Sequence, residues 1–589
     1  MPPVPAPVPA AALAHRVALA LTIAAAAAPS LLAYNVSPSP TFLNQALALG
    51  LWGAWAAVGA APASWRGPAP LQAALGLVAL AAAWSWVGGA LPASLALSAL
   101  GALAAAAVLV AGGSGRRTSG ARTELFALFG WAWLVAGLLN AGVAVVQVFL
   151  PGLPDGEWIA HSGFPGRAVG NLRQPNHLSS LLLWACIAVV ALFELGRLRR
   201  RAAALAGAVL VFAVVLTASR TGLVSVLMLA LWGFFDRRLS RPARAMLLAA
   251  PLLYALSWLG MAQWATLSQH AFGGSQRLAE SDISSSRFAI WRDTWALIRM
   301  HPWAGVGFGE FNFAWTLTPF PHRPVAFFDH THNLPLQLAV ELGLPLAGAV
   351  MALLLWALWR AAHQAWTAQG EEGMARRAAF MIVLMIGLHS LLEYPLWYSY
   401  FLLPTAWAFG FALHRAAPCP APGRGARAAP GMVLAALAVV AGAAFSVVDY
   451  ARVAEIFSTS PDAAPLEQRI ASGQRSVFFA HHADYAEVTS GVPVRDPAHA
   501  FDRAAHYLLD TRFMIAWARS LAERGQLDAA RHLAARLREF HNADAAEFFE
   551  ACAAPASAPA SAPAVAARPF QCEPPAHAPG WQAFLPHPG

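Results

Sequence analysis

Charged residues are scarce in this 589-residue sequence, because Asp, Glu, Lys and Arg together make up only 12% of it. Soluble globular proteins carry about 25% charged residues. Hydrophobic residues make up 58% of the chain and the mean hydropathy is +0.51. This composition excludes an ordinary soluble protein and predicts a membrane protein that crosses the bilayer many times. The net charge of +9 comes from few acids and clustered arginines, which indicates membrane topology and not nucleic-acid binding.

Motifs of the common metal sites are also missing. The four cysteines are Cys186, Cys419, Cys552 and Cys572, and no two of them have CxxC spacing. The sequence has no HExxH and no DxD motif either. We therefore expect neither a metal ion nor a cofactor. Cys552 and Cys572 flank the low-complexity stretch 554–569, where they could form a disulfide on the oxidising side of a membrane or remain two free thiols.

Long apolar segments provide the fold class. A membrane-crossing helix needs about 20 mostly apolar residues. Such segments predict an all-α polytopic protein with about 12–13 transmembrane helices, a large periplasmic loop and a small helical periplasmic domain at the C-terminus. The predicted spans lie near residues 17–34, 41–62, 69–88, 91–112, 124–150, 178–195, 202–217, 221–235, 245–262, 334–359, 377–394, 396–413 and 430–448.

Arginine clusters set the predicted topology. Clusters such as 197–201 and 236–244 follow alternate spans and fall on one side of the membrane if the N-terminus is cytoplasmic. The organisation expected is N-terminal transmembrane helices (1–150), a central transmembrane region with a short periplasmic loop (151–262), a large periplasmic loop (263–333), C-terminal transmembrane helices (334–448) and a periplasmic helical domain with a low-complexity tail (449–589). Within the last region, residues 513–540 predict two amphipathic helices around Gly525.

Arginines on the outer side break this charge pattern. They are Arg167, Arg173, Arg220, Arg287 and Arg292. A guanidinium is a planar fork of donors that matches phosphate oxygens. Arg220, in a tight "SRTG" turn between two apolar helices, needs a partner for its charge and is the strongest candidate. Arg292 is followed by Asp293, so a surface ion pair is the simpler interpretation there.

The segment "FFDHTHNLPLQLAVELGLPLAG" (327–348) is the second exception. Asn333 and His332 stand where the outer loop meets a helix, and Gln337 and Glu341 share one face of that helix. Pro345 releases the carbonyl of residue 341, which permits a broken helix lining a polar cavity. A metal at Asp329, His330 and His332 lacks further ligands, so we favour His332 as a general base; its ordinary pKa of about 6.5 suits that role. Asp329 and His330 are expected to be solvated loop residues.

These segments resemble the O-antigen ligase-like superfamily of bacterial inner-membrane proteins. The pattern is "SRTG", then "SSSRFAIWRDTWALIRMHPWAGVGFGEFNFAW" (284–315), then a histidine that opens a helix. His332, Asn333 and Gly343 match the histidine signature of that superfamily, whereas Leu346 departs from it. The stretches 166–182 and 391–410 are most similar to the general protein O-oligosaccharyltransferases, and the resemblance covers residues 160–415.

The resemblance implies transfer of a glycan from undecaprenyl diphosphate to Ser or Thr hydroxyls of exported proteins, such as pilins or lipoproteins, at the periplasmic face of the inner membrane. In that reading His332 is the base, and Arg220 and Arg287 stabilise the diphosphate leaving group, with Arg167 and Arg173 as weaker candidates. Asn333 and Glu341 orient the acceptor or the histidine. The side chains expected to contact sugar hydroxyls are those of Gln174, Asn176 and His177.

Three other functions remain open at this stage. An O-antigen ligase would use the lipid A core as acceptor, and an O-antigen polymerase would need no protein acceptor. A transporter also fits about a dozen helices with intramembrane His and Glu residues. Against a transporter, the polar residues gather at one face of the membrane and the sequence shows no inverted repeat.

Overall fold

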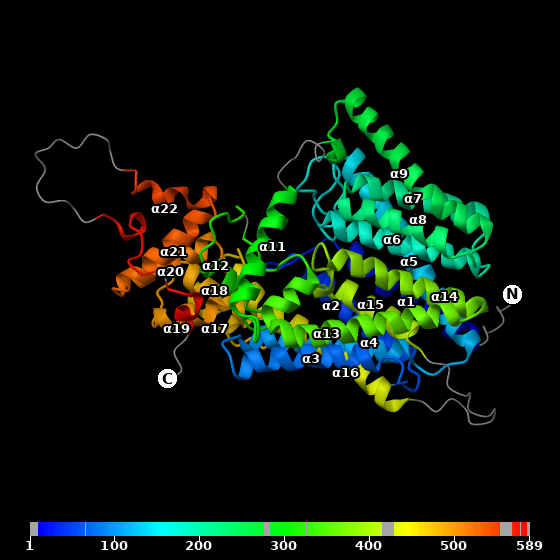
Figure 1. Ribbon diagram of the computed structural model, residues 1–589, viewed down its shortest axis with the longest axis horizontal. Helices are drawn as coiled ribbons and strands as arrows, with labels where there is room; N and C mark the ends of the chain where they lie inside the picture. The colour runs from blue at the N-terminus through cyan, green and yellow to red at the C-terminus, as the bar shows by residue number, and fades with distance from the viewer. Residues whose placement is uncertain are drawn as a thin grey trace, which may run out of the picture. The chain divides into compact units, whose positions relative to one another are not determined.

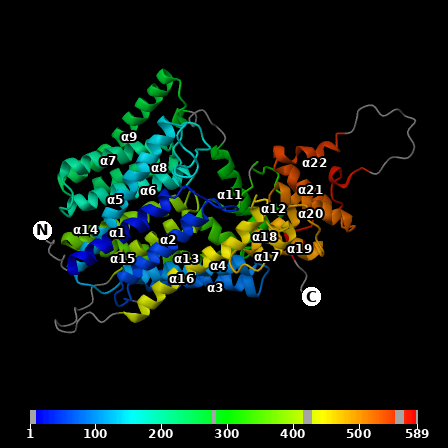
Figure 2. The ribbon, with the colours of Figure 1, turned by 180° about the vertical axis from the view of Figure 1, so that it is seen from behind.

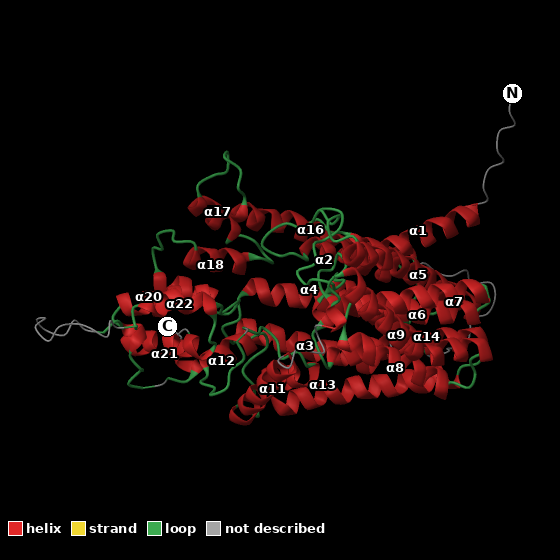
Figure 3. Ribbon diagram, turned by 90° about the horizontal axis from the view of Figure 1, so that it is seen from above, coloured by secondary structure: helices red, strands yellow, loops and turns green. Residues whose placement is uncertain are grey.

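The structure is a computed structural model of the chain (Figure 1). It describes residues 10–64, 66–275, 283–325, 327–414, 429–553, 568–577 and 579–585. Within these residues the chain forms helices and no β-strand (Figure 3). The all-α fold class is therefore confirmed.

The first helices of the chain, together with the later apolar ones, coincide one for one with the thirteen predicted spans. They are α1 (Ala10–Leu31), α2 (Phe42–Val58), α3 (Ala69–Val87), α4 (Ala93–Gly113), α5 (Ser119–Phe149), α6 (Pro175–Glu194), α7 (Arg200–Leu216), α8 (Arg220–Phe235), α9 (Arg241–Ser268), α13 (Leu334–Thr367), α14 (Gly370–Ser390), α15 (Ser399–Ala412) and α16 (Pro430–Ala454).

Seven of the described helices are long and apolar enough to cross a bilayer: α3, α4, α5, α6, α9, α13 and the segment Pro430–Phe457, which includes α16. The segments His15–Leu31, Phe42–Val58 and Arg220–Phe235 are apolar but shorter. The chain is thus a multi-pass membrane protein. The total of about 12–13 spans stays a prediction.

The remaining helices are amphipathic or short. They are α11 (Ile283–Met300), α12 (Phe311–Leu317), α17 (Leu466–Gly473), α18 (Ala480–Thr489), α19 (Pro497–Ala504), α20 (Thr511–Glu523), α21 (Leu527–Glu539) and α22 (Ala546–Glu550), with the 3-10 helices η1 (Pro395–Trp397), η2 (Glu455–Phe457), η3 (Ala543–Ala545), η4 (Phe570–Cys572) and η5 (Trp581–Phe584).

The chain divides into two compact units. The first comprises Met1–Leu75, Gly101–Glu280 and Ala352–Val447, and the second comprises Gly76–Leu100, Ser281–Met351 and Val448–Gly589. Four of the five boundaries between these segments fall inside helices, namely α3, α4, α13 and α16. The five regions expected from the sequence stay a prediction.

The first unit is a helix bundle built around α6. This helix packs against α5, α7 and α14, and 89% of its most apolar stretch is buried. Aromatic side chains fill the core beside it; for example, the rings of Phe129 and Trp407 stack 4.6 Å apart. Because α6 is surrounded by protein, the polar side chains at its first turn need hydrogen-bond partners within the protein. The candidate site begins at this turn.

Ion pairs join helices of this bundle near the arginine-rich ends. Arg122 of α5 and Arg376 of α14 both bind Glu372, at 3.1 Å and 2.5 Å, and Arg377 lies 2.8 Å from Asp236. The three guanidinium groups are buried. These arginines therefore link α5, α14 and the end of α8, a packing role beyond the topological one that the sequence indicates.

The second unit contains the helical C-terminal region (Figure 2). The predicted amphipathic pair is α20 and α21, which pack together on either side of Gly525, a residue with φ of 78°. Their apolar faces form one core with α12, to which Trp315, Phe513 and Leu533 contribute. Cys552 and Cys572 form a disulfide, which settles the alternative left open by the sequence.

Candidate active site

The N-terminus of α6 gathers the polar residues of the first unit. Gln174 is the N-cap, and its side-chain oxygen accepts hydrogen bonds from the backbone N–H groups of Asn176 and His177. Pro175 occupies the first helical position, where its missing N–H costs no hydrogen bond. Before the cap, Arg173 has φ of 56°, a conformation that non-glycine residues rarely adopt outside functional or strained sites.

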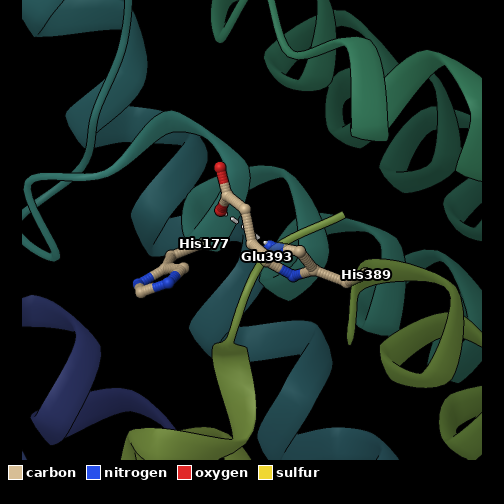
Figure 4. A group of neighbouring side chains, drawn as sticks. All are labelled: His177, His389 and Glu393. Carbon is tan, nitrogen blue, oxygen red and sulfur yellow. Dashed lines mark hydrogen bonds and ion pairs between the residues drawn. The ribbon is translucent and has the colours of Figure 1, made fainter. Parts of the chain in front are cut away.

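A buried carboxylate holds these polar side chains. Glu393 accepts hydrogen bonds from the amide of Gln174, at 2.8 Å, and from the amide of Asn176. His389, one helical turn before Glu393, places its Nε2 atom 3.1 Å from the same carboxylate (Figure 4). The Nδ1 atom of His389 lies 2.8 Å from the hydroxyl of Ser180. Both carboxylate oxygens are therefore bonded, as a buried charge requires.

The same network extends to the start of α8. The hydroxyl of Ser219 donates to the Asn176 side-chain oxygen and accepts the N–H of Gly222, at 2.9 Å, as the N-cap of α8. Arg220 is the first residue of that helix and is exposed. Ala218, just before the cap, has φ of 49°. The Glu393 network thus fixes the backbone from which the Arg220 guanidinium projects.

His177 is buried beside the network and not open to solvent. Its Nδ1 atom lies 3.1 Å from the Tyr400 hydroxyl, and its ring packs 4.6 Å from that of Tyr398. This burial favours a packing role over the predicted contact with sugar.

Ligand atoms of His177, His389 and Glu393 lie within 4.8 Å of one another and could hold a metal ion (Figure 4). However, His389 and Glu393 are already bonded to each other and to Ser180, Gln174 and Asn176. A metal would have to replace several of these bonds. We therefore favour a hydrogen-bonded network, and the expected absence of a metal stays a prediction.

Two further candidate arginines bind backbone carbonyls of their own unit. The Nε atom of Arg167 donates to the Thr217 carbonyl at 3.1 Å, and a Cβ atom on Gly273 would lie only 1.9 Å from the Arg167 side chain. Arg173 donates to the Ala33 carbonyl, and burial lowers its pKa. These contacts favour a supporting role for both in the loop before α6.

The histidine segment belongs to the second unit. His332 has φ of 55°, another left-handed backbone in a candidate catalytic position. Its neighbours are anchored on both sides: the Thr331 carbonyl accepts the indole N–H of Trp291 at 2.9 Å, and the Thr331 N–H donates to Gln337 at 2.8 Å. The Asn333 side chain accepts the N–H of Leu336 in the first turn of α13, at 3.1 Å. The ring of Phe328 packs edge-on against His332 at 5.2 Å.

The helix after His332 is broken at Gly343, which has φ of 73° and ψ of 161°. Pro345 has no N–H and therefore leaves the Glu341 carbonyl without a helical partner. This carbonyl accepts the N–H of Gly307 at 3.0 Å. Leu344 donates its N–H to the Pro302 carbonyl at 2.7 Å. The Glu341 side chain is buried and accepts the Gln337 amide at 2.9 Å. A loop of the second unit thus replaces the lost helical bonds.

Asp329 and His330 pair with each other at 3.0 Å. Burial opposes the charge on Asp329, but the adjacent His330 outweighs it and holds the pKa of that carboxyl below its ordinary value. Arg287 lies half-buried on α11, three residues before the fully buried Ile290. Arg292 donates to the His322 carbonyl at 3.0 Å and lies 3.8 Å from Asp293, in line with its interpretation as a surface residue.

The predicted site residues therefore fall into two sets. Arg167, Arg173, Gln174, Asn176, His177 and Arg220 belong to the first unit, and Arg287, His332, Asn333 and Glu341 to the second. Sequence reasoning omitted Glu393, His389 and Ser219 from the site. His389 and Glu393 are four positions apart in an apolar segment, and this spacing predicts that they share one helix face. The spacing does not predict which residues of other segments lie opposite that face.

Comparison with known proteins gives three family matches. Residues 205–351 match the family described as "O-Antigen ligase", residues 168–193 match "Protein glycosylation ligase", and residues 377–554 match "Virulence factor membrane-bound polymerase, C-terminal". The O-antigen ligase match includes Arg220, Arg287 and His332. The protein glycosylation ligase match includes Gln174, Asn176 and His177.

Two curated relatives come from Acinetobacter baylyi. The chain is 26% identical over 313 residues to a general O-oligosaccharyltransferase, covering 50% of this chain and 52% of the relative. It is 25% identical over 284 residues to a ComP-specific O-oligosaccharyltransferase, covering 46% and 47%. The chain thus spans about half the length of the curated relatives it matches. On these matches and the motifs above, the chain is similar to the O-antigen ligase-like superfamily and to the O-oligosaccharyltransferases within it.

Proposed function

We propose that this protein is a glycosyltransferase that moves an oligosaccharide en bloc from undecaprenyl diphosphate to Ser or Thr hydroxyls of exported proteins. The reaction takes place at the periplasmic face of the bacterial inner membrane. The observation that carries the proposal is His332. It has a strained backbone in an anchored loop, it precedes a broken helix that carries the buried Gln337 and Glu341, and it lies in the segment that matches the O-antigen ligase family. The similarity to two O-oligosaccharyltransferases supports a protein acceptor.

In the proposed reaction the acceptor oxygen attacks the anomeric carbon of the first sugar. The bond from that carbon to the diphosphate oxygen breaks, and undecaprenyl diphosphate leaves. His332 takes the proton of the acceptor hydroxyl, and Asn333 and Glu341 maintain the geometry of its loop and helix. Proton transfer by a positioned group contributes typically 10²–10⁴-fold in rate.

Negative charge develops on the leaving diphosphate and has to be stabilised in the transition state. Arg220 and Arg287 perform this task because guanidinium groups form paired hydrogen bonds with phosphate oxygens. The Glu393 network, through Asn176 and Ser219, holds the helix start that carries Arg220. Gln174 belongs to the same network, while Arg167 and Arg173 stabilise the adjacent loop.

A reconstitution experiment tests the proposal. The purified chain in liposomes, given undecaprenyl-diphosphate glycan and an exported acceptor protein, is expected to yield glycopeptides modified at Ser or Thr. His332→Asn is expected to reduce transfer by at least 10²-fold while the protein still inserts, because asparagine tolerates a left-handed backbone but cannot act as the base. Full activity in His332→Asn would remove the proposed base.

The family match over residues 205–351 favours one alternative, an O-antigen ligase that uses the same chemistry with a lipid acceptor. Supplying lipid A core in place of the protein acceptor separates the two functions. Transfer to lipid A core alone would replace the proposed acceptor, and formation of longer lipid-linked glycans with neither acceptor present would indicate a polymerase.

A further inference from the structure

An open groove of about 470 Å³ lies in the second unit, along one face of α20. Ile515, Ala516, Arg512 and Arg519 of this helix form one side, and Phe327 and Asp544 contribute to the rest of the lining. Ligand pockets in proteins commonly measure 300–1,000 Å³. The groove is therefore large enough for a few residues of polypeptide.

The lining combines apolar side chains with charges of both signs. Phe327, Ile515 and Ala516 are half-buried, whereas Arg512, Arg519 and Asp544 are exposed. The groove is lined by two carboxylates, Asp510 and Asp544, as well as by the two guanidinium groups, and these carboxylates would repel a diphosphate. Phe327 stacks one face of its ring on Phe540 at 3.9 Å, which fixes the ring in the wall of the groove. This composition fits a mixed polypeptide with apolar side chains and backbone donors and acceptors.

The groove is connected to the proposed base by a short, anchored segment. Phe327 and His332 are five positions apart, and five residues span at most about 18 Å. The segment is held by the Asn312 amide, which donates to the Phe328 carbonyl at 2.8 Å, and by the Trp291 bond to Thr331. An extended peptide of about five or six residues that starts in the groove can therefore reach His332.

We propose that this groove, termed the α20 groove, binds a short extended segment of the acceptor protein on one side of the hydroxyl residue that is glycosylated. The inference rests on the proposed function, and it assigns acceptor binding to the C-terminal helical region. The occupant is a polypeptide of the exported acceptor, not the lipid-linked donor.

Substitutions on the groove surface test this. Ala516→Trp fills the groove and Arg512→Glu reverses one charge at its edge. Their matched controls are Gln526→Trp and Arg495→Glu, which change exposed residues of the same region outside the groove. In full-length protein in liposomes, both groove variants are expected to raise the KM for acceptor protein at least fivefold and to leave the KM for lipid-linked donor unchanged. The controls are expected to match the unmodified chain in both constants.

A photo-crosslinking amino acid at position 512 is expected to capture the acceptor protein, and the same amino acid at position 495 is not. If the unmodified chain glycosylates no protein, the proposed function itself fails. If the unmodified chain is active but Ala516→Trp and Arg512→Glu match their controls in acceptor KM, the α20 groove is not the acceptor site. Capture of the glycan donor or of a second copy of this chain at position 512 would also overturn the inference.

Discussion

At the scale of single residues, left-handed backbones coincide with the candidate site. Five described non-glycine residues have positive φ, and three of them are Arg173, Ala218 and His332. Each such residue costs of order 1–3 kcal/mol and persists only where the surroundings enforce it. Different contacts hold these three backbones. Arg173 and Ala218 each precede the N-cap residue of a helix, Gln174 of α6 and Ser219 of α8. His332 follows Thr331, whose backbone is bonded to Trp291 and Gln337.

A charge exchange between Glu393 and Asn176 tests the network. Glu393→Gln presents amide hydrogens to the amides of Gln174 and Asn176, leaving a buried donor without an acceptor. We expect transfer to fall at least tenfold. In the double variant with Asn176→Asp, the new amide can donate to the new carboxylate, so activity is expected to recover in part.

Steady-state transfer rates of the two single variants and the double variant measure this coupling. If the fold-loss in the double variant equals or exceeds the product of the two single fold-losses, Glu393 and Asn176 do not act as a unit.

At the scale of secondary structure, the break in α13 depends on Gly343. A Cβ atom there would lie 2.2 Å from the Trp303 carbonyl oxygen, and φ of 73° is unfavourable for any other residue. Gly343→Ala is expected to destabilise the protein by about 3 kcal/mol or more and to abolish transfer. Gly348→Ala, in the same helix with no neighbour within 4 Å of the added atom, is expected to be neutral or slightly stabilising.

Thermal unfolding in detergent, with transfer rates in liposomes, separates these two variants. Equal stability of Gly343→Ala and Gly348→Ala would mean that the break does not require a glycine.

Acid is expected to loosen α21. Burial lowers the pKa of His532 to about 4. The Leu317 carbonyl lies 2.8 Å from the His532 Nε2 atom and partly offsets this effect, whereas Arg536 and Arg323 lower the pKa of His532 further. The unfolded chain binds a proton on this histidine below about pH 6.5 and the folded chain only near pH 4. Stability from this group is thus complete above pH 6.5 and falls as the pH drops from 6.5 to 4, by about 3 kcal/mol.

Hydrogen exchange of α21 amides at pH 7.5 and 5.0 measures this, after correction for intrinsic exchange. His532→Gln keeps a donor for Leu317 without a titratable ring and is expected to reduce the pH effect. The same pH dependence in both proteins would assign the effect to other groups, such as the buried His481 and His482.

At the scale of the whole molecule, every one of the 39 basic residues is an arginine, since the chain contains no lysine. Arginine therefore supplies the cation of the buried ion pairs that Arg122, Arg376 and Arg377 form. It is also the residue type of the proposed phosphate-binding positions and of the clusters from which the topology is predicted.

Labelling of single cysteines tests the predicted orientation. Glu157→Cys in the loop before α6 and Arg237→Cys in the loop after α8 place thiols at exposed positions, in a Cys419→Ser background. A membrane-impermeant maleimide added to spheroplasts is expected to label position 157 and to reach position 237 only after permeabilisation. The reverse pattern would place the candidate site on the cytoplasmic side.

Much of the architecture was predictable because it depends on local properties of the chain. Apolar segments located all thirteen of the helices expected to span the membrane, the "SRTG" turn separated α7 from α8, and the amphipathic pattern around Gly525 located α20 and α21. Local patterns did not give the roles of His177, Arg167 and Arg173. These roles depend on the Tyr400 hydroxyl beside His177 and on the carbonyls that the two arginines bind, which all come from other segments.

The sequence by itself determined a helical, multi-pass membrane protein with a helix broken near Pro345, because hydropathy and proline act through the local backbone. Only the tertiary structure decided that Glu393 is the centre of the polar network, since its partners Gln174 and Asn176 lie more than 200 positions earlier in the chain. It also decided that the carbonyl of Glu341 is bonded to Gly307, and that Cys552 pairs with Cys572. Hydrogen bonds between distant segments depend on how the helices pack, and no local pattern encodes that packing.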